Sequence, residues 1–431
     1  MEKNNVKTEF KRIASELGKV PTRIEFKKFS RISYYWVVKL FETYESLKVA
    51  CKLSDEGLKS EIETMKQYKA HRREKNLKQL QAKYYEKLEK QKIIQEECIK
   101  AIDGAIAMIQ PDQIEVKRMK DDITKGNQDA KAAILWLDIS DCQIGTLVER
   151  KSIGELNEHD WSVWQKKLEI YKQAVIEKIR EVRDNYNLRE VKLAFLGDIV
   201  EGSEIFRDQK NFIDANVFIQ TFEGANDLGK MILSLAGTFP QLKFKAYAVA
   251  GNHGRVGFKG ENPFHVNFDQ FLYKYMENKL YVEAKEKNLT NIDFNFNITW
   301  FELISVFKGY DGPMKETGWI NLIIHGDDIK MHYGIPFYGI ARSGAKYDKM
   351  LMKHIQYRHL GHFHQPAELT NFAGIDLING CWPGDTEFSL KTLNSSTRPL
   401  QKGFLFTPED GIVESYNFYL EEYKKPAVRV L

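Results

Sequence analysis

A strong net charge, cysteine pairs and long apolar runs are all missing from this sequence of 431 residues. Its four cysteines (Cys51, Cys98, Cys142 and Cys381) include no CxxC pair, which argues against a disulfide framework and against a cysteine-based zinc site. This pattern is typical of a reducing compartment, so we expect a cytoplasmic protein. No apolar run reaches the ~18 residues of a membrane span, and the start lacks the apolar core of a signal peptide, so we expect neither membrane insertion nor secretion.

The charge that is present is unevenly distributed. Lys and Arg number 64 against 60 Asp and Glu, which leaves a net charge of only +4. Residues 1–53 contain 12 Lys and Arg but 6 Asp and Glu, so this segment alone carries +6. An apolar share of 43% indicates a folded globular protein, and the length suits two domains better than one.

Three zones differ in composition, with boundaries near 53 and 131. The first, residues 1–53, contains short helical patterns with clear ends: an apolar stripe stops at Gly18, and Thr22 to Glu25 reads as a capping box. Further short helices are expected over 34–41 and 44–53. We therefore predict a small basic module made only of helices.

The second zone, residues 54–131, is expected to be a long helix followed by a linker. Residues 54–105 lack proline and are rich in Lys, Glu, Gln and Leu, which favour a helix. The apolar stripe is broken, so a solvated helix is favoured over a strong coiled coil. A homodimer, or an ATPase partner bound through this segment, is left open.

The third zone, residues 132–431, alternates strands and helices. Amphipathic helices are expected over 161–185 and 218–235, which indicates an α/β fold. Apolar runs typical of buried strands occur at 134–139, 191–196, 244–250, 322–324 and 355–360.

Each of these five apolar runs ends in polar residues that can bind metals. Because the carboxyl ends of strands in α/β sheets meet at one crevice, we expect these ends to gather, with neighbouring glycines allowing close approach. The ends are Ser140-Asp141-Cys142-Gln143-Ile144-Gly145, Gly197-Asp198-Ile199-Val200-Glu201, Gly251-Asn252-His253-Gly254, His325-Gly326-Asp327 and Gly361-His362-Phe363-His364.

The donor types predict a metal centre rather than isolated turns. A single Gly-Asp or His is usually structural, but five such ends in series are hard to obtain by chance. Carboxylate, amide and imidazole donors suit Mn, Fe, Zn, Ni or Mg. The donors are too many for one ion, and two ions about 3.5–4 Å apart that share a carboxylate suit in-line displacement at phosphorus.

The ordered series resembles the calcineurin-like metallophosphoesterase superfamily, whose signature is D-x-H, GD-x-x-[DE], GNH, H and GH-x-H. The resemblance covers roughly residues 132–405. It implies an α/β fold, a four-layer α/β/β/α metallophosphoesterase sandwich, here preceded by the small helical module and the helical linker. It also implies a dinuclear centre in which a hydroxide between two ions attacks phosphorus.

Carried over motif by motif, the resemblance implies two ligand sets that share Asp198. The first ion would be held by Asp141, Gln143, Asp198 and His364. The second would be held by Asp198, Asn252, His325 and His362. His253 would contact the phosphate and protonate the leaving oxygen, and Glu201 would support the site from behind the ligands.

Gln143 is the one departure from the pattern, since the superfamily usually has His at this position. Its carbonyl oxygen is a weaker and harder donor than imidazole, which tilts the first site toward Mn or Mg, lowers its affinity or leaves it half-occupied. The remaining ligands favour an active enzyme. We therefore expect two divalent ions, Mn first, with Mg, Fe, Ni or Zn as alternatives. Asp138 is a rival carboxylate for the first motif, but the sequence context favours Asp141.

Flanking residues point toward nucleic acid. Arg255 places a guanidinium beside the site, suited to a phosphate oxygen, although a surface role is equally compatible. Residues 201–209 and 380–385 resemble those of phage and prophage metallophosphoesterases, commonly grouped near the SbcD-like DNA-repair exonucleases. This resemblance favours DNA as the substrate and a phage or prophage origin.

The basic module supplies a separate indication of DNA. Residues 16–26 and 41–53 resemble the helical repeat attached to homing and HNH endonucleases, which implies DNA binding. The charge of +6 and the interleaved aromatic residues agree. The alternative is a basic helical cap whose aromatic residues form its core. The cations expected to contact DNA are Lys19, Arg23, Lys27, Lys28 and Arg31.

These observations favour a metal-dependent phosphodiesterase that hydrolyses DNA. Two alternatives stay open: a phosphomonoesterase or nucleotide phosphatase, because the same ions serve both reactions, and a DNA-binding scaffold in which Gln143 has weakened the site.

Overall fold

The computed structural model describes residues 1–52, 78, 129–203, 205, 209–297, 299–330, 336–391 and 396–421. The chain divides into two units, Met1–Gln113 and Ile114–Leu431, and each is described by itself. The long helix and linker predicted for 54–131 lie outside the described residues, apart from Lys78 and 129–131. Among the helices that are described, none has the length and apolar character needed to cross a bilayer.

The described part of the N-terminal unit consists of four short helices: α1 (Lys3–Leu17), α2 (Arg23–Phe29), α3 (Tyr34–Phe41) and α4 (Tyr44–Cys51). The expected stop at Gly18 is present, with a left-handed φ of 67°. The expected capping box is present as well. Glu25 N donates to Thr22 Oγ1 over 3.3 Å, and Thr22 N donates to Glu25 Oε2 over 2.8 Å. Local signals therefore place these helix ends.

The aromatic residues of this unit divide between its core and its surface. Phe10, Phe26 and Tyr44 pack against one another with ring centroids 5.8 Å apart. Phe29 and Tyr35, by contrast, are 43% and 59% exposed. Part of the aromatic content is thus needed to build a core in so small a unit, and part is not.

The larger unit contains two mixed β-sheets. The first has the order β11-β10-β1-β2-β3-β4 and the second the order β5-β6-β7-β9-β8. Strands β1 to β4 are mutually parallel, as are β6, β7 and β9. The bounds are β1 Ala132–Ile139, β2 Asn187–Phe195, β3 Lys243–Ala248, β4 Ile292–Asn295, β5 Phe301–Val306, β6 Trp319–Ile324, β7 Tyr357–Leu360, β8 Ala367–Asn371, β9 Gly374–Ile378, β10 Leu400–Thr407 and β11 Gly411–Tyr419.

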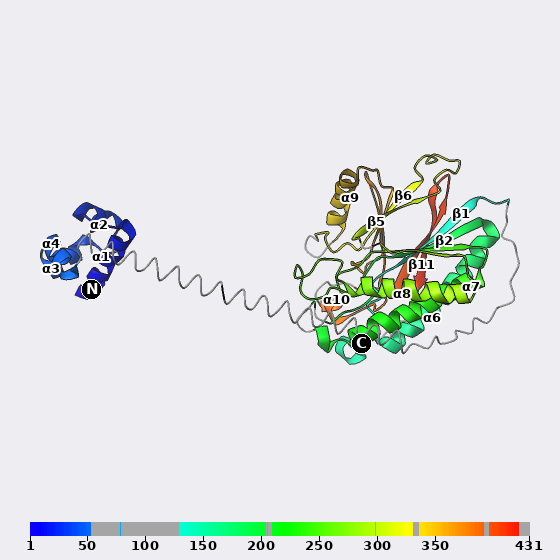
Figure 1. Ribbon diagram of the computed structural model, residues 1–431, viewed down its shortest axis with the longest axis horizontal. Helices are drawn as coiled ribbons and strands as arrows, with labels where there is room; N and C mark the ends of the chain where they lie inside the picture. Colours follow the sequence, from blue (N-terminus) through cyan, green and yellow to red (C-terminus); the bar gives the residue numbers. More distant parts are fainter. Residues whose placement is uncertain are drawn as a thin grey trace, which may run out of the picture. The chain divides into compact units, whose positions relative to one another are not determined.

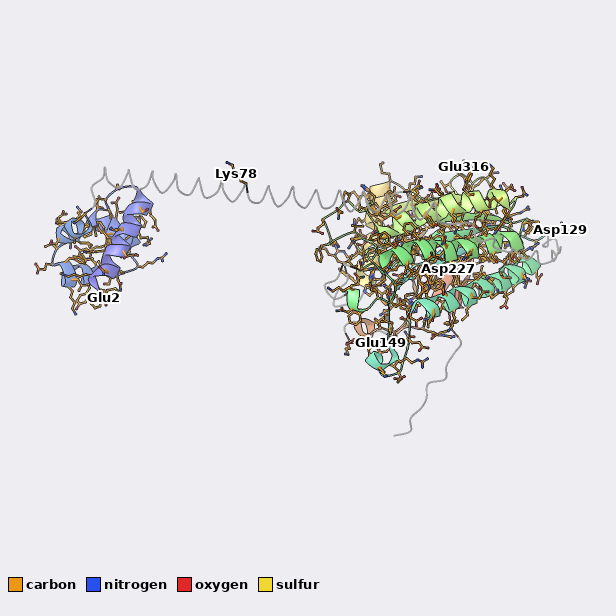
Figure 2. The ribbon with its side chains drawn as sticks, turned by 60° about the horizontal axis from the view of Figure 1, so that its bottom comes forward. Glu2, Lys78, Asp129, Glu149, Asp227 and Glu316 are labelled. Carbon is orange, nitrogen blue, oxygen red and sulfur yellow. The ribbon has the colours of Figure 1, made fainter. Side chains whose placement is uncertain are left out.

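Helices cover the outer faces of these sheets. Figures 1 and 2 show α6 (Trp161–Asn185), α7 (Gly224–Thr238) and α8 (Phe268–Glu286) side by side, and their apolar residues pack on the first sheet. Helix α9 (Phe337–Leu351) packs on the second sheet through Ile340 and Tyr347. The short helical segments are η1 (Arg150–Ile153), η2 (Gln209–Asn211), η3 (Ile219–Glu223) and α10 (Glu387–Lys391).

A third apolar cluster lies between the two sheets, and strand β1 shows why its sequence is apolar throughout. Ile134 and Trp136 point into the cluster between the sheets, together with Ile304 and Tyr357 of the second sheet. The alternate residues of β1, such as Leu135, point toward the helices. A strand that is covered on both faces needs apolar side chains at successive positions.

The predicted mixed α/β fold with two sheets and flanking helices is therefore confirmed. Each of the five expected apolar runs contains a strand, with ends shifted by a few residues, and α6 spans the expected 161–185. The helix expected over 218–235 differs at its start. Residues Ile219–Glu223 form a π turn, and the regular helix begins only at Gly224.

Candidate metal centre

The five polar strand ends meet at one place, where β1, β2 and β3 of the first sheet approach β6 and β7 of the second. Ligand atoms of Asp198, His325 and His362 all lie within 4.8 Å of one another. Asp141 is joined to the same place, because its Oδ1 accepts from His362 N over 3.0 Å and lies 3.2 Å from His364 Nε2. Residues that are far apart in the sequence thus form one buried polar group.

Many of these residues have an unusual backbone. Among the described residues, five of the seven predicted ligands have a left-handed φ: Asp141 (49°), Gln143 (42°), Asp198 (53°), His362 (70°) and His364 (59°). Each such residue costs about 1 kcal/mol or more, and it persists only where the surrounding structure enforces it. Such a concentration at one place is typical of a functional site.

Two glycines allow the loops after β2 and β3 to touch. A Cβ atom on Gly197 would lie 2.4 Å from the backbone nitrogen of Gly251. A Cβ atom on Gly251 would lie 2.1 Å from Oδ1 of Asp198. Only glycine fits at both positions, so the Gly-Asp and Gly-Asn-His motifs owe their glycines to close packing around Asp198.

His325 is oriented as a metal ligand should be. Its Nδ1 donates to the backbone oxygen of Leu196 over 2.8 Å, so its Nε2 points inward. There Nε2 lies 3.0 Å from Asp198 Oδ2 and 3.2 Å from Asn252 Oδ1. A ring nitrogen and two oxygens that converge in this way need a cation between them, either a proton or a metal ion. The donor set therefore fits a divalent ion.

The pKa values of these residues also indicate that the site favours a positive charge. Burial opposes charge on both partners, but the mutual attraction of Asp198 and His325 outweighs it. This attraction raises the pKa of His325 to about 10 and holds the pKa of Asp198 well below its usual range. Burial and the charge of His325 lower the pKa of His362 to about 4, which keeps its ring neutral. Metal binding competes with protons for such ligands.

Asp141, Gln143 and His364 form a second, looser part of the centre. Asp141 Oδ2 accepts from Ser140 Oγ over 2.6 Å, which fixes the carboxylate. Gln143 Nε2 lies 3.4 Å from His364 Nε2 and 3.5 Å from His253 Nε2. The amide thus faces the centre, and rotation of its last side-chain bond exchanges its oxygen and nitrogen. Gln143 occupies the position where the motif usually has His.

His253 stands beside the ligands, and Glu201 holds its ring. Nδ1 of His253 lies 3.0 Å from Glu201 Oε2, so Nε2 faces inward, 3.9 Å from Asp198 Oδ2. Glu201 is itself fixed by hydrogen bonds of 2.8 Å from Thr146 Oγ1 and Gln209 Nε2. Against the effect of burial, the charges of Glu201 and Asp198 raise the pKa of His253 to about 9.

Arg255 lies at the edge of the centre, where its guanidinium is paired with Asp327. Both side chains are about a quarter exposed, at 25% and 28%. Asp327 follows His325 by two positions, so this pair joins the loops after β3 and β6. A phosphate contact of Arg255 stays a prediction.

Sequence reasoning missed Asp269, the residue that holds the ligand loops together. Its buried carboxylate accepts hydrogen bonds from the backbone nitrogens of Asp198, Ile199, Val200 and Gly251, over 2.9–3.0 Å. Burial and the charge of Asp198 raise its pKa to about 6. In the sequence, Asn267-Phe268-Asp269 looks like an ordinary acidic helix start, and only the fold shows its second role.

Asp138, the rival carboxylate of the first motif, lies elsewhere. It is fully buried, accepts from Trp136 Nε1 over 2.7 Å and contacts His359 Nδ1 at 2.9 Å. His359 in turn lies 3.1 Å from Asn321 Oδ1. This network belongs to the core between the sheets, whereas Asp141 lies beside His362 and His364.

The cations predicted to contact DNA lie on and around α2, and most have partners within the unit. Lys19 forms an ion pair of 2.7 Å with Glu25. Arg23 and Lys27 lie over the Tyr34 ring, at 4.9 and 4.6 Å from its centroid. Lys28 lies 5.3 Å from the Phe29 centroid, and Arg31 is exposed.

Comparison with known proteins gives solved structures only. No family model matches the chain, and no curated protein matches it. Vps29 of Entamoeba histolytica, solved with Zn²⁺, is 9% identical, with a TM-score of 0.26 over 66% of this chain and 99% of its own. An archaeal phosphodiesterase is 10% identical, with a TM-score of 0.29 over 66% and 98%.

A hypothetical protein of Pyrococcus horikoshii is 13% identical, with a TM-score of 0.31 over 68% of this chain and 89% of its own. Because similarity at this level carries no activity from one protein to another, the chemistry must be argued from the residues of the centre.

Proposed function

We propose that this chain is a metal-dependent phosphoester hydrolase of the calcineurin-like superfamily. The observation that carries the proposal is the convergence of His325 Nε2 with oxygens of Asp198 and Asn252, at strand ends from both sheets. The succession of helices, two packed sheets and a further helix is compatible with the four-layer sandwich of that superfamily. The helical N-terminal unit would precede it as a separate domain.

Two ions are part of this proposal. The better-ordered group would hold one ion through Asp198, Asn252, His325 and His362. The looser group would hold the other through Asp141, Gln143, Asp198 and His364. Mixed oxygen and nitrogen sites of this kind suit Mn, with Mg, Fe, Ni and Zn as alternatives.

The ions would supply two things: a lower pKa for the attacking water and neutralisation of the charge that develops at phosphorus. The chain supplies the rest. His253 directs Nε2 into the centre and can donate its proton to the leaving oxygen. Glu201 fixes the ring by accepting from Nδ1, so that the proton on Nε2 points into the centre.

DNA is the substrate that this proposal favours. The N-terminal unit combines an excess of cations with a fold separate from the centre, an arrangement that suits a polyanion longer than the site itself. Arg255 at the rim can bind a phosphate oxygen once it exchanges its partner Asp327. The presence of Gln143, where the superfamily usually has His, favours one competing proposal, a DNA-binding scaffold with a weakened site.

The test uses the full chain, stripped with chelator and reloaded with Mn, Mg or Zn. Turnover is measured with a chromogenic phosphodiester, a chromogenic phosphomonoester, and labelled single- and double-stranded DNA. Asp198→Asn is the inactive variant, and Asp311→Asn is its control, because Asp311 is 94% exposed in a distant loop.

We expect metal-dependent cleavage of the phosphodiester and of DNA by the parent chain and by Asp311→Asn. Cleavage of the monoester alone would replace the nuclease with a phosphatase. If the chain binds DNA and metal but shows no turnover, the result would favour the DNA-binding scaffold over the hydrolase. A chain that binds no metal would overturn the proposal.

A further inference from the structure

A concave basic groove lies on the N-terminal unit, on a surface other than α2. It has a volume of about 490 Å³ and is lined by Asn4, Lys7, Thr8, Lys11, Ala50, Cys51 and Lys52. The four α1 residues of this lining follow the spacing i, i+3, i+4, i+7, so they form one stripe along the helix. The other three come from the end of α4. We refer to this surface as the α1–α4 groove.

The cations of the α1–α4 groove differ in their partners from the cations on and around α2. Lys19 is paired with Glu25, whereas Lys27 and Lys28 lie over the rings of Tyr34 and Phe29. Within the described residues 1–52, ion pairs join carboxylates to Arg12, Lys19 and Lys48. None of these pairs includes Lys7, Lys11 or Lys52. Lys19 must exchange its carboxylate partner before it can bind a phosphate, and Lys27 and Lys28 must give up their ring contacts. The groove lysines face no such exchange within this part of the chain.

The shape of the surface adds to the difference. A groove can bring several ammonium groups to one stretch of phosphates at once, whereas a convex helix presents them singly. Asn4 and Thr8, both exposed on the same stripe as Lys7 and Lys11, add polar groups that can contact phosphate or sugar oxygens. Cys51 is only 4% exposed and forms part of the lining rather than a competing reactive group.

We propose that the α1–α4 groove, and not α2, is the surface of this unit that binds the phosphate backbone of DNA, through Lys7, Lys11 and Lys52. The choice of DNA as partner rests on the proposed function. Lys19, Lys27 and Lys28 then contribute to the general positive charge of the unit but make fewer direct phosphate contacts.

The test compares two triple variants of the full chain that each remove three positive charges. One is Lys7→Gln/Lys11→Gln/Lys52→Gln, and the other is Lys19→Gln/Lys27→Gln/Lys28→Gln. Binding of a fluorescein-labelled 30-base-pair duplex is titrated at several salt concentrations, with chelator present so that the probe stays intact. Each lysine–phosphate contact contributes about 0.9 to the slope of log K against log salt.

We expect the groove variant to lower this slope by about 2 to 3 and the α2 variant to lower it by less than about 1. A charge-retaining variant, Lys7→Arg/Lys11→Arg/Lys52→Arg, should keep the parent slope. Equal losses in both Gln variants, or a larger loss in the α2 variant, would overturn the inference, as would a parent chain whose binding has no salt dependence.

One further control separates binding from folding. Because Lys7, Lys11 and Lys52 surround the C-terminal end of α4, they can also stabilise its helix dipole. Helical circular dichroism and the unfolding midpoint should be unchanged in the groove variant.

Turnover of the small phosphodiester tests the metal centre separately. The groove variant should retain it, because every proposed ligand lies after residue 140. Retained turnover with an unchanged salt slope would contradict DNA binding by the groove but support the proposed hydrolase activity. A reduced slope in a chain without metal-dependent turnover would support DNA binding by the groove but contradict the hydrolase activity.

Discussion

The two halves of the metal centre differ in how completely the protein prepares them. In the half around Asp198, the ring of His325 is fixed from behind by Leu196, and its Nε2 already meets two oxygens at 3.0 and 3.2 Å. In the half around Asp141, Gln143 approaches the ring of His364 only at 3.4 Å, and His364 is 26% exposed. A site whose donors are held before the ion arrives loses less entropy on binding, so the half around Asp198 should bind metal more tightly.

Both halves nevertheless depend on Asp198, and its removal should have the largest effect. Asp198→Ala deletes the carboxylate between them and leaves His325 without its partner. We expect turnover to fall by at least about 100-fold and bound metal to fall in both halves. Mutation of residues that only hydrogen-bond to metal ligands already lowers activity by about 10–100-fold. Metal content by mass spectrometry and phosphodiester turnover measure this, with Asp311→Ala as the control. Normal metal content and turnover would refute the shared ligand.

Substitution of Asp269 should have the next largest effect, because its carboxylate accepts hydrogen bonds from the ends of two strands. Asp269→Asn replaces one carboxylate oxygen with a donor, so two of the four backbone N–H groups that it now satisfies lose their acceptor. At about 1–3 kcal/mol for each buried donor, the free energy of unfolding should fall by about 2–6 kcal/mol. Urea denaturation measures it. A change in the free energy of unfolding below about 1 kcal/mol would show that the two loops keep their conformation without Asp269.

Glu201→Gln should separate metal binding from proton transfer. The substitution removes the charge that orients His253 but touches none of the proposed ligands. We expect kcat to fall by about 10–100-fold for esters with poor leaving groups, and much less for a nitrophenyl ester that needs no proton. Metal content should not change. An equal loss for both kinds of ester would assign Glu201 to the structure rather than to the leaving-group step.

Gln143→His should make the two halves more alike in metal affinity, and it should have the smallest effect of the series. An imidazole in place of the amide gives the half around Asp141 a stronger donor, so its affinity for Zn²⁺ should rise by about 10-fold. The half around Asp198 should titrate as before. Identical titrations of the parent and the variant would mean that Gln143 does not touch the ion.

Local patterns in the sequence predicted the elements that carry this centre. Apolar runs located β1, β2, β3, β6 and β7, and the polar residues that follow them do lie together. The helix ends at Gly18 and Thr22 were also predictable, because caps depend on residues close in the sequence. Signals of this kind reach only a few positions along the chain.

Features that depend on distant residues escaped prediction. The bond from the Asp198 backbone to Asp269 spans 71 positions. The left-handed φ at Asp198 and His362 depends on packing as well as on residue type, since Asp and His tolerate this conformation better than most residues but still adopt it in a minority of cases. The partners of Lys19 and Lys27 are near in the sequence but were also missed, because an ion pair with Glu25 or a contact with Tyr34 depends on how the chain turns between the short helices.

Anomalous diffraction from a crystal of the full chain soaked in Mn²⁺ tests the central claim most directly. Two peaks about 3.5–4 Å apart are predicted, with the Asp198 carboxylate between them and the stronger peak beside His325 and His362. The peak beside Asp141 and Gln143 should have the lower occupancy. A single peak, or peaks away from Asp198, would contradict a two-ion hydrolase.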